Sequence, residues 1–328
     1  MGSCCHNFSD IQRVRVLLPV TLKQLRYFDA LSRELHFGRA AEICAVTQPA
    51  MSMQISELEQ ELGLALVERT RTGIMLTAEG EEIARRISRI LGDVRELVSF
   101  AHHSNRMLTG ILHLGVIPSI APYILPPLLP LLKKEYPELE LYMRETQTLH
   151  LVNELLEGKL DVLLLALPIN HQDLEEFRLF NDTFLLALSK NRKISGRVRA
   201  TKEMIENEKL LLLEEGHCLR DQALAYCDLK QVDAVNTFGA SSLSTIVEMV
   251  AADLGVTLLP EMSLAMEQRG RSLTLMRLAD PEPSRTIGLV WRSSSPRKED
   301  YKEFGRLVLE AWEKGPQMFA KLRHSSMN

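Results

Sequence analysis

The stretch that decides the fold of the N-terminal part is residues 47–63, which read TQPAMSMQISELEQELG. Thr47 is a favourable helix cap and Pro49 suits a first turn, whereas Gly63 is typical of the residue just past a helix end. Between these signals, apolar residues recur at helical spacing. They are Met51, Ile55, Leu58 and Leu62. The stretch predicts an amphipathic helix that buries one face and leaves its N-terminal tip, at Gln48, open to a partner.

Two further helices are predicted before this one, and a hairpin after it. Residues 21–24 read TLKQ, a capping box that opens an apolar helical stripe, and residues 37–44 carry a second, shorter stripe. Residues 64–76 group two arginines with Gly73 and resemble a short hairpin. Three helices followed by such a hairpin predict a winged helix-turn-helix DNA-binding domain over residues 21–77.

The expected DNA contacts lie at the tip of the third helix and on the hairpin. Glutamine can pair with adenine in the major groove, while serine hydroxyls and the N–H groups of a helix start hold phosphates. The outward positions of the helix are Gln48, Pro49, Ser52 and Met53, and the hairpin arginines are Arg69 and Arg71. Six Lys/Arg stand against seven Asp/Glu in this domain. A helical protein-interaction module is therefore an alternative on pattern alone.

A long helix is predicted over residues 78–105. Its apolar residues are spaced alternately four and three apart, as in a coiled-coil seam. They are Ile83, Ile87, Ile90, Val94, Leu97 and Ala101. Because so short a seam needs a partner helix, this segment is predicted to dimerise. The alternative is an amphipathic helix that lies on its own domain.

Residues 109–315 alternate predicted strands and helices, which favours mostly parallel sheets covered by helices on both faces. The length suits two α/β lobes with a cleft between them. We expect lobe I to comprise residues 109–167 and 284–315, and lobe II residues 168–283. Lobe II includes expected strands at 209–213 and 234–238.

Composition excludes several classes of protein. The 328 residues are 45% hydrophobic and 25% charged, which is typical of globular domains, and the net charge of −4 gives no bulk sign of nucleic-acid binding. Residues 114–132 are uncharged, but their five prolines argue against a membrane span. Residues 1–20 are expected to be a disordered leader without a targeting signal. Five scattered cysteines favour a cytoplasmic location.

A second constellation lies at residues 214–227, which read EEGHCLRDQALAYC. His217, Arg220 and a nearby helix start would favour the thiolate of Cys218, and Cys227 could serve as a resolving thiol. Spacing alone leaves open, and favours, two unrelated helix cysteines; it does not suit zinc. If the segment is helical, about 13 Å separates the two cysteines, whereas a disulfide needs Cα atoms within ~7 Å. The helix would have to unwind before the bond could form.

The first 60 residues after Thr21 closely resemble LysR-type transcriptional regulators. The resemblance rests on several motifs in order, including LKQLRYF at 22–28, HFGRAA at 36–41, TQPAMS at 47–52 and LTAEG at 76–80. It implies a dimerising linker helix after the wing and an effector domain shaped like a two-lobed periplasmic binding protein.

The rest of the chain resembles one branch of that family, the OxyR peroxide sensors. Matching segments include IPSIAPYILP at 117–126, ETQT at 145–148 and RTIGLV at 285–290, besides the cysteine segment. The resemblance implies that Cys218 is the peroxidatic thiol and Cys227 its resolving partner. The residues it implies around the thiolate and the peroxide are Ser119, Thr148, His217, Arg220, Asp221 and Arg285.

Two positions depart from that branch. Ser119 stands where threonine is usual, which keeps the hydroxyl, and Arg144 stands where histidine is frequent. Arg144 could still favour a thiolate electrostatically.

The expected function is a DNA-binding transcriptional regulator that senses hydrogen peroxide by a reversible Cys218–Cys227 disulfide. It would be no enzyme and need no cofactor or metal. Expected partners are a double-stranded DNA operator, RNA polymerase and further copies in a homodimer or homotetramer. One alternative is a regulator of the same family that binds a small organic effector in the cleft. A more distant one is a thiol peroxidase, which would have no use for a DNA-binding domain.

Overall fold

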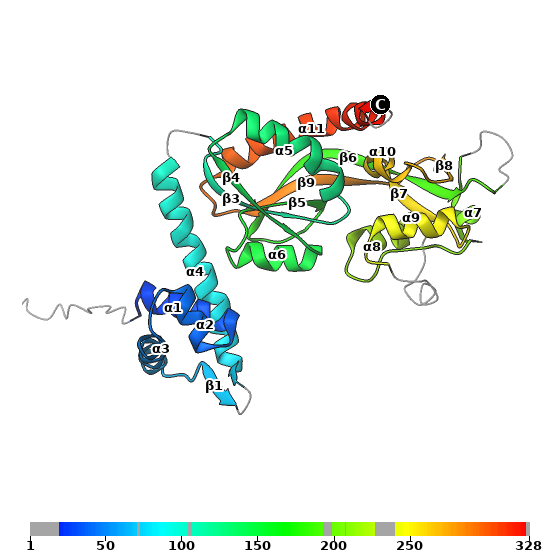
Figure 1. The fold of residues 1–328 in the computed structure, drawn as a ribbon. Helices are drawn as coiled ribbons and strands as arrows, with labels where there is room; N and C mark the ends of the chain where they lie inside the picture. The colour runs from blue at the N-terminus through cyan, green and yellow to red at the C-terminus, as the bar shows by residue number, and fades with distance from the viewer. Residues whose placement is uncertain are drawn as a thin grey trace, which may run out of the picture. The chain divides into compact units, whose positions relative to one another are not determined.

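The computed structural model describes residues 20–70, 73–103, 107–192, 199–206, 208–226 and 240–325. The chain divides into two compact units, Met1–Leu91 and Gly92–Asn328, each of which is described by itself (Figure 1). The predicted leader lies almost wholly outside the described residues.

The first unit is the predicted winged helix-turn-helix. The capping box forms as expected, because the Thr21 amide donates to Gln24 Oε1 at 2.8 Å and the Thr21 side chain accepts from the Gln24 amide. The Thr47 hydroxyl likewise caps the third helix by accepting from the Ala50 amide. The wing strands pair antiparallel. The elements are α1 (Leu22–Glu34), α2 (Phe37–Ile43), α3 (Gln48–Leu62), β1 (Val67–Thr70), β2 (Gly73–Leu76) and the first part of α4 (Ala78–His103), a helix that continues into the second unit.

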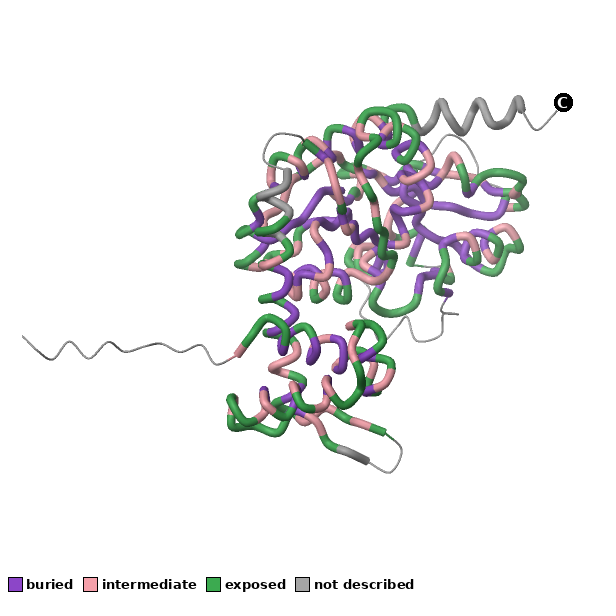
Figure 2. Tube along the Cα trace, turned by 60° about the vertical axis from the view of Figure 1, so that its left-hand side comes forward, coloured by how far each residue is buried: buried purple, intermediate pink, exposed green. Residues whose placement is uncertain are grey.

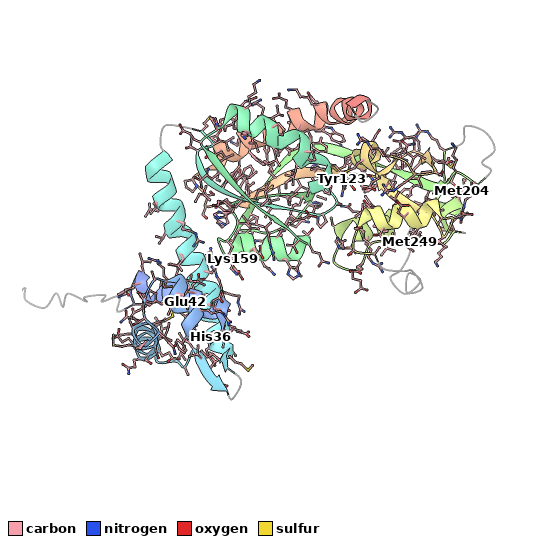
Figure 3. The ribbon with its side chains drawn as sticks, in the orientation of Figure 1. His36, Glu42, Tyr123, Lys159, Met204 and Met249 are labelled. Atoms are coloured by element: carbon pink, nitrogen blue, oxygen red, sulfur yellow. The ribbon has the colours of Figure 1, made fainter. Side chains whose placement is uncertain are left out.

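The cap of α2 is an imidazole. His36, labelled in Figure 3, accepts hydrogen bonds at Nδ1 from the amides of Gly38 at 3.1 Å and Arg39 at 3.3 Å. Behind the helix tips, Phe28, Leu31 and Met51 are fully buried in one apolar cluster. Helix α3 therefore packs on this core through Met51, while Gln48 and Pro49 in its first turn stay exposed.

The predicted dimer seam on α4 is partly wrong. Ile87 is only 3% exposed and belongs to the core of the first unit, and Ile83 packs against that core. An apolar seam residue serves its own domain wherever α4 packs on it. Farther along, Ile90 and Leu97 are 45% and 66% exposed. The seam thus divides into a half used within the chain and a half left exposed.

The second unit is built on one curled sheet in the order β4-β3-β5-β9-β6-β7, with β8 paired to β6. The two-lobed fold expected from the sequence is confirmed. Helices α5 and α11 cover one face of the strands around β3 and α6 the other (Figure 1), and buried residues follow the strands (Figure 2). The strands are β3 (Gly110–Val116), β4 (Leu139–Glu145), β5 (Val162–Leu167), β6 (Leu174–Ser189), β7 (Thr257–Pro260), β8 (Leu273–Arg277) and β9 (Ser284–Arg292).

The expectation of mostly parallel sheets is wrong. Among the described strands, only the pairs that β3 makes with β4 and β5 are parallel, whereas the β5–β9 pair and all pairs of β6 are antiparallel; three isolated bridges are also parallel. The reason is β6, a strand of 16 residues. Its residues 174–183 pair with β9, and its residues 184–189 pair with β7 and β8. One long strand therefore joins the two halves of the sheet.

Helices follow most strands of the second unit, as the sequence predicts, but two expected strands are not among those described. Residues 209–213 form isolated bridges at Leu210 and Leu213 instead of a strand, and the expected strand at 234–238 lies outside the described residues. The proline-rich segment ends in α5, and no described helix is long and apolar enough to cross a bilayer. The helices are α5 (Ala121–Glu135), α6 (Thr148–Leu156), α7 (Lys202–Glu206), α8 (Cys218–Tyr226), α9 (Leu243–Ala251), η2 (Glu261–Ser263), α10 (Leu264–Glu267) and α11 (Lys298–Ser325).

Candidate functional site

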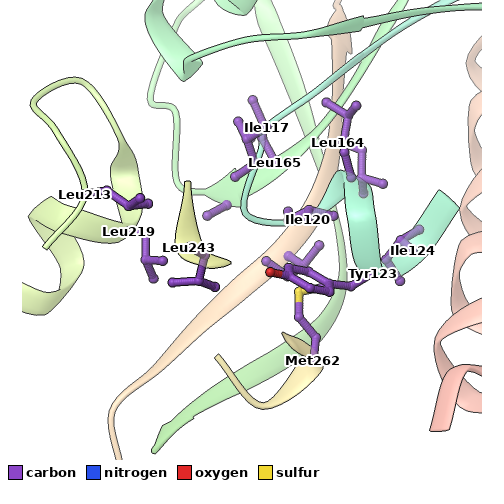
Figure 4. Close-up of a cluster of buried hydrophobic side chains, with 14 of the residues drawn as sticks. Ile117, Ile120, Tyr123, Ile124, Leu164, Leu165, Leu213, Leu219, Leu243 and Met262 are labelled. Atoms are coloured by element: carbon purple, nitrogen blue, oxygen red, sulfur yellow. The ribbon is translucent and has the colours of Figure 1, made fainter. Parts of the chain in front are cut away.

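Cys218 is the first residue of α8, directly after a tight turn. Gly216 adopts φ +87°, a left-handed conformation that glycine tolerates best. Leu219, the next residue of the helix, is buried with Leu213 and Leu243 in the apolar cluster of the unit (Figure 4). Leu219 therefore anchors the start of α8 in this cluster, and Cys218 beside it is half-buried.

A small cavity of about 10 Å³ adjoins the thiol. This is roughly the space that one water molecule needs. Three chain segments enclose it: the turn after β3, the start of α6 and the start of α8. The described lining residues are Ile117, Pro118, Ser119, Gln147, Thr148, Gly216, His217, Cys218 and Leu219.

Arg285 is the charged group of this site. It is 2% exposed, and its guanidinium forms an ion pair with Asp182 Oδ2 at 2.9 Å from Nη2 and 3.0 Å from Nε. The other donors reach Ser119 Oγ at 2.7 Å and Ser119 O at 3.0 Å, and Met262 Sδ at 3.2 Å. Asp182 also accepts from the Met262 amide at 3.0 Å. The guanidinium is thus fixed from β6, from the turn after β3 and from η2.

Two opposing effects act on the Cys218 thiol. Burial raises its pKa, and this effect is the larger; the Arg285 charge and the Thr148 hydroxyl both lower it. Thr148 Oγ1 is buried without a hydrogen-bond partner of regular geometry among the described groups. Its hydroxyl is therefore available to a thiolate or to a small molecule in the cavity.

The sequence predicts that His217 and Arg220 favour the thiolate of Cys218, but the positive charge with the largest effect on its pKa is that of Arg285. Burial lowers the pKa of His217, which favours its neutral form. Arg220 is buried and donates from Nη1 to the Leu213 carbonyl at 3.1 Å. Both side chains pack around the loop, and the positive charge that acts on Cys218 comes from Arg285, far away in the sequence.

Two other acidic or basic positions lie outside the cavity lining. Asp221 is exposed, and its charge raises the pKa of Cys218, so it does not support a thiolate. Arg144, on β4, is 57% exposed in its side chain and pairs with Glu154 of α6 at 3.4 Å. A role of Arg144 in favouring the thiolate therefore stays a prediction.

Cys227 lies outside the described residues, so its place is not part of the site geometry. The helix itself sets a constraint: α8 runs from Cys218 to Tyr226, which places these Cα atoms about 12 Å apart. One further residue reaches only about 3.8 Å, while a disulfide needs Cα atoms within ~7 Å. A Cys218–Cys227 disulfide therefore requires α8 to open.

Four of the predicted DNA-contact residues lie in the first two turns of α3. Gln48 and Pro49 are exposed in the first turn of α3, Met53 is 58% exposed and Ser52 is half-buried. Arg69 lies in β1 with its side chain outside the described part, and Arg71 lies outside it altogether. The exposed N-terminal tip of α3 is the surface that a major groove would receive.

Three residues of the site had not been predicted. Asp182 shows a signal in hindsight, because it is a charged residue directly before the apolar run of β6. Met262 and Gln147 carry no such signal; their roles follow from the way distant segments meet. Within the described residues, no group of three or more His, Cys, Asp or Glu could hold a metal ion.

Comparisons with known proteins agree with both units. Residues 22–81 match the model of the bacterial regulatory helix-turn-helix proteins of the lysR family, and residues 105–313 match the LysR substrate-binding domain. The chain is 38% identical over 289 residues to the DNA-binding transcriptional dual regulator OxyR of Escherichia coli, covering 88% of this chain and 95% of that protein. It is 42% identical over 294 residues to a probable hydrogen peroxide-inducible genes activator of Streptomyces viridosporus, covering 89% and 94%.

A solved structure is similar over the same extent. A cysteine-to-serine mutant of Corynebacterium glutamicum OxyR, described as H2O2-bound, aligns with a TM-score of 0.65 and 34% identity over 92% of this chain and 95% of that one.

The buried ion pair leads to a first prediction. Replacing Asp182→Asn should lower the free energy of unfolding by about 3–5 kcal/mol, because it leaves the Arg285 charge buried and unpaired. Chemical denaturation of the reduced protein measures this. The matched control, Asp173→Asn, changes an exposed carboxylate and should stay within about 0.5 kcal/mol of the parent protein. Equal stability of both variants would contradict the assigned role of the pair.

Proposed function

The chain belongs to the LysR family of bacterial transcriptional regulators, in its OxyR branch, and we propose that it controls DNA binding through oxidation of Cys218 by hydrogen peroxide. The observation that carries the proposal is the thiol beside a cavity of about 10 Å³, with Arg285 close enough to act on its charge and with two hydroxyls, Ser119 and Thr148, in the lining.

The size of the cavity favours peroxide over an organic effector at this place. Pockets for organic ligands usually measure about 300–1,000 Å³, whereas this one holds little more than a water molecule. An open hollow of about 570 Å³ exists elsewhere, around Ser244, Glu267 and Arg271. Arg271 in this hollow already pairs with Glu248 at 2.6 Å and with Glu267 at 2.9 Å, so the Arg271 charge is compensated within the chain.

The first chemical step is attack of the Cys218 sulfur on one peroxide oxygen. The S–O bond forms while the O–O bond breaks, the sulfur is oxidised to a sulfenic acid, and the second oxygen leaves as water after taking the thiol proton. Arg285 stabilises the thiolate that attacks. Ser119 and Thr148 offer hydroxyl groups that can orient the peroxide and donate to the leaving oxygen.

The second step is condensation with the thiol of Cys227. A disulfide forms and the sulfenic oxygen leaves as water. Because α8 keeps its ends about 12 Å apart, the bond selects an opened backbone. Two backbone states set by one bond are the requirement for a switch.

The change at Cys218 would reach the DNA-binding units through contacts between copies of the chain. We infer a homodimer or homotetramer in which the exposed half of α4, with Ile90, Leu97 and Val98, meets a second copy. A change in the effector unit would then alter the angle between two helix-turn-helix units and the half-site spacing they span. Double-stranded operator DNA and RNA polymerase are the proposed partners. The proposed chemistry uses no cofactor, and the regulator consumes peroxide only as a signal.

Mass spectrometry of cysteine peptides tests the central step. One equivalent of peroxide should convert the Cys218 peptide into a disulfide with the Cys227 peptide. Cys218→Ser should abolish the change in DNA footprint, while Cys227→Ser should stop at a sulfenic acid or oxidise further. If Cys218 stays reduced while an organic ligand changes the footprint, the small-effector alternative replaces this proposal. Sustained catalytic turnover of peroxide would instead favour the thiol peroxidase.

Base readout by Gln48 is tested by substitution to alanine. Binding to a selected high-affinity DNA site should weaken by about 1–3 kcal/mol, while binding to random DNA should hardly change, because only the base contact is lost. Gln60→Ala, which alters an exposed glutamine near the other end of α3, is the control. An equal loss on both DNAs would remove base readout from the role of Gln48.

The exposed half of α4 is tested by sedimentation. The double substitution of Ile90 and Leu97 to aspartate should disrupt the oligomer, because it would bury unpaired like charges between two helices. Glu79→Asp in the first turn serves as the control. An unchanged oligomer with intact operator binding would contradict the assignment of this face.

A further inference from the structure

We propose that Gln147 determines which peroxide reaches Cys218: its side-chain amide closes the outer side of the cavity, so that hydrogen peroxide enters and alkyl hydroperoxides do not. The inference deepens the proposed function and rests on it. Its evidence is separate, since it comes from contacts between the start of α6 and the turn before α8.

Gln147 is held across the gap between these two segments. It occupies the N-cap position of α6, but its side chain makes no capping hydrogen bond. Instead, Nε2 donates to the carbonyl oxygen of Glu215 at 3.1 Å. This hydrogen bond holds the Gln147 amide against the loop that carries Cys218.

The amide also lies flat against Gly216. A Cβ atom built at Gly216 would lie 2.5 Å from Gln147 Oε1 and 2.8 Å from its Cδ, so a side chain at this position would displace the Gln147 amide. The φ of +87° also favours glycine here. The turn and the amide are therefore in direct contact beside the cavity.

This contact lies at the most exposed of the residues that line the cavity. Gly216 is exposed, whereas the other described lining residues are half-buried (Pro118, Gln147, Thr148 and Cys218) or buried (Ile117, Ser119, His217 and Leu219). Gln147 contacts Gly216 there. We infer that a molecule entering beside Gly216 passes the Gln147 amide.

Access must supply the selectivity, because the chemistry does not. An alkyl hydroperoxide also oxidises a thiol to a sulfenic acid: the S–O bond forms, the O–O bond breaks, and the alcohol leaves with the thiol proton in place of water. The space of about 10 Å³ suits a molecule hardly larger than water and has no room for a tertiary alkyl group. Shortening Gln147 to alanine removes the amide and opens this side of the cavity.

Rates of Cys218 oxidation test the proposal in the full-length reduced protein. The oxidants are hydrogen peroxide and tert-butyl hydroperoxide, and quenched samples are analysed by mass spectrometry. In Gln147→Ala, the ratio of the two rates should fall by about tenfold or more, chiefly because tert-butyl hydroperoxide reacts faster; steric pockets commonly discriminate to this extent. Gln172→Ala, at an exposed glutamine of the same unit, should keep the parent ratio.

The outcomes distinguish a failure of the proposed function from a failure of the role proposed for Gln147. If hydrogen peroxide does not oxidise Cys218 in the parent protein, the proposed function fails. If it does, but Gln147→Ala keeps the parent ratio or slows both oxidants equally, the role of Gln147 in selectivity is refuted. Since the side chain does not cap α6, the variant should keep its fold, which circular dichroism and thermal unfolding verify. A second variant, Gln147→Gly, should shift the ratio in the same direction.

Discussion

The buried ion pair between Asp182 and Arg285 is the constraint on which the effector unit depends. The two residues face each other on neighbouring strands, β6 and β9, and both side chains are fully buried. A guanidinium at this depth is tolerated only because its charge is paired and its donors are satisfied. The remaining donors hold the turn at Ser119 and the sulfur of Met262. One pair thus connects the two strands to Ser119 in the lining of the cysteine site and to Met262 in η2.

The same arrangement places the Cys218 thiol under two opposing effects on its pKa. Burial disfavours the thiolate of Cys218 and is the larger effect, whereas Arg285 favours it, so a small rearrangement can shift the pKa of the thiol. The cavity suits a small molecule. The proposed disulfide with Cys227 then requires α8 to open, because the length of the helix keeps the two residues apart. The proposed selectivity and switching therefore both rest on packing and helix geometry.

Local patterns in the sequence predicted the local structure well, since caps and apolar spacing act over a few residues: the box at Thr21, the cap at Thr47 and the start of α8 at Cys218 all form. Contacts between distant segments could not be predicted in this way. Local sequence assigns the positive charge that acts on the Cys218 thiol to its neighbours His217 and Arg220. Nothing in it shows that the pKa of His217 is lowered, which favours the neutral form, or that Arg220 donates to a backbone carbonyl. Only the resemblance to a known family brought in Arg285. The 16-residue strand β6, which makes the sheet mostly antiparallel, also escaped prediction at its full length, because only residues 184–188 form an apolar run and polar residues break the pattern over 174–183.

The most direct measurement is the pKa of Cys218, followed by the ultraviolet absorbance of the thiolate in a protein whose other four cysteines are replaced by serine. If Arg285 is the charge that acts on the sulfur, Arg285→Met raises the pKa of Cys218 above that of the parent, because the positive charge that offsets burial is lost, while Arg220→Met leaves the pKa unchanged. The opposite result, a pKa that responds to Arg220→Met and not to Arg285→Met, would contradict the account.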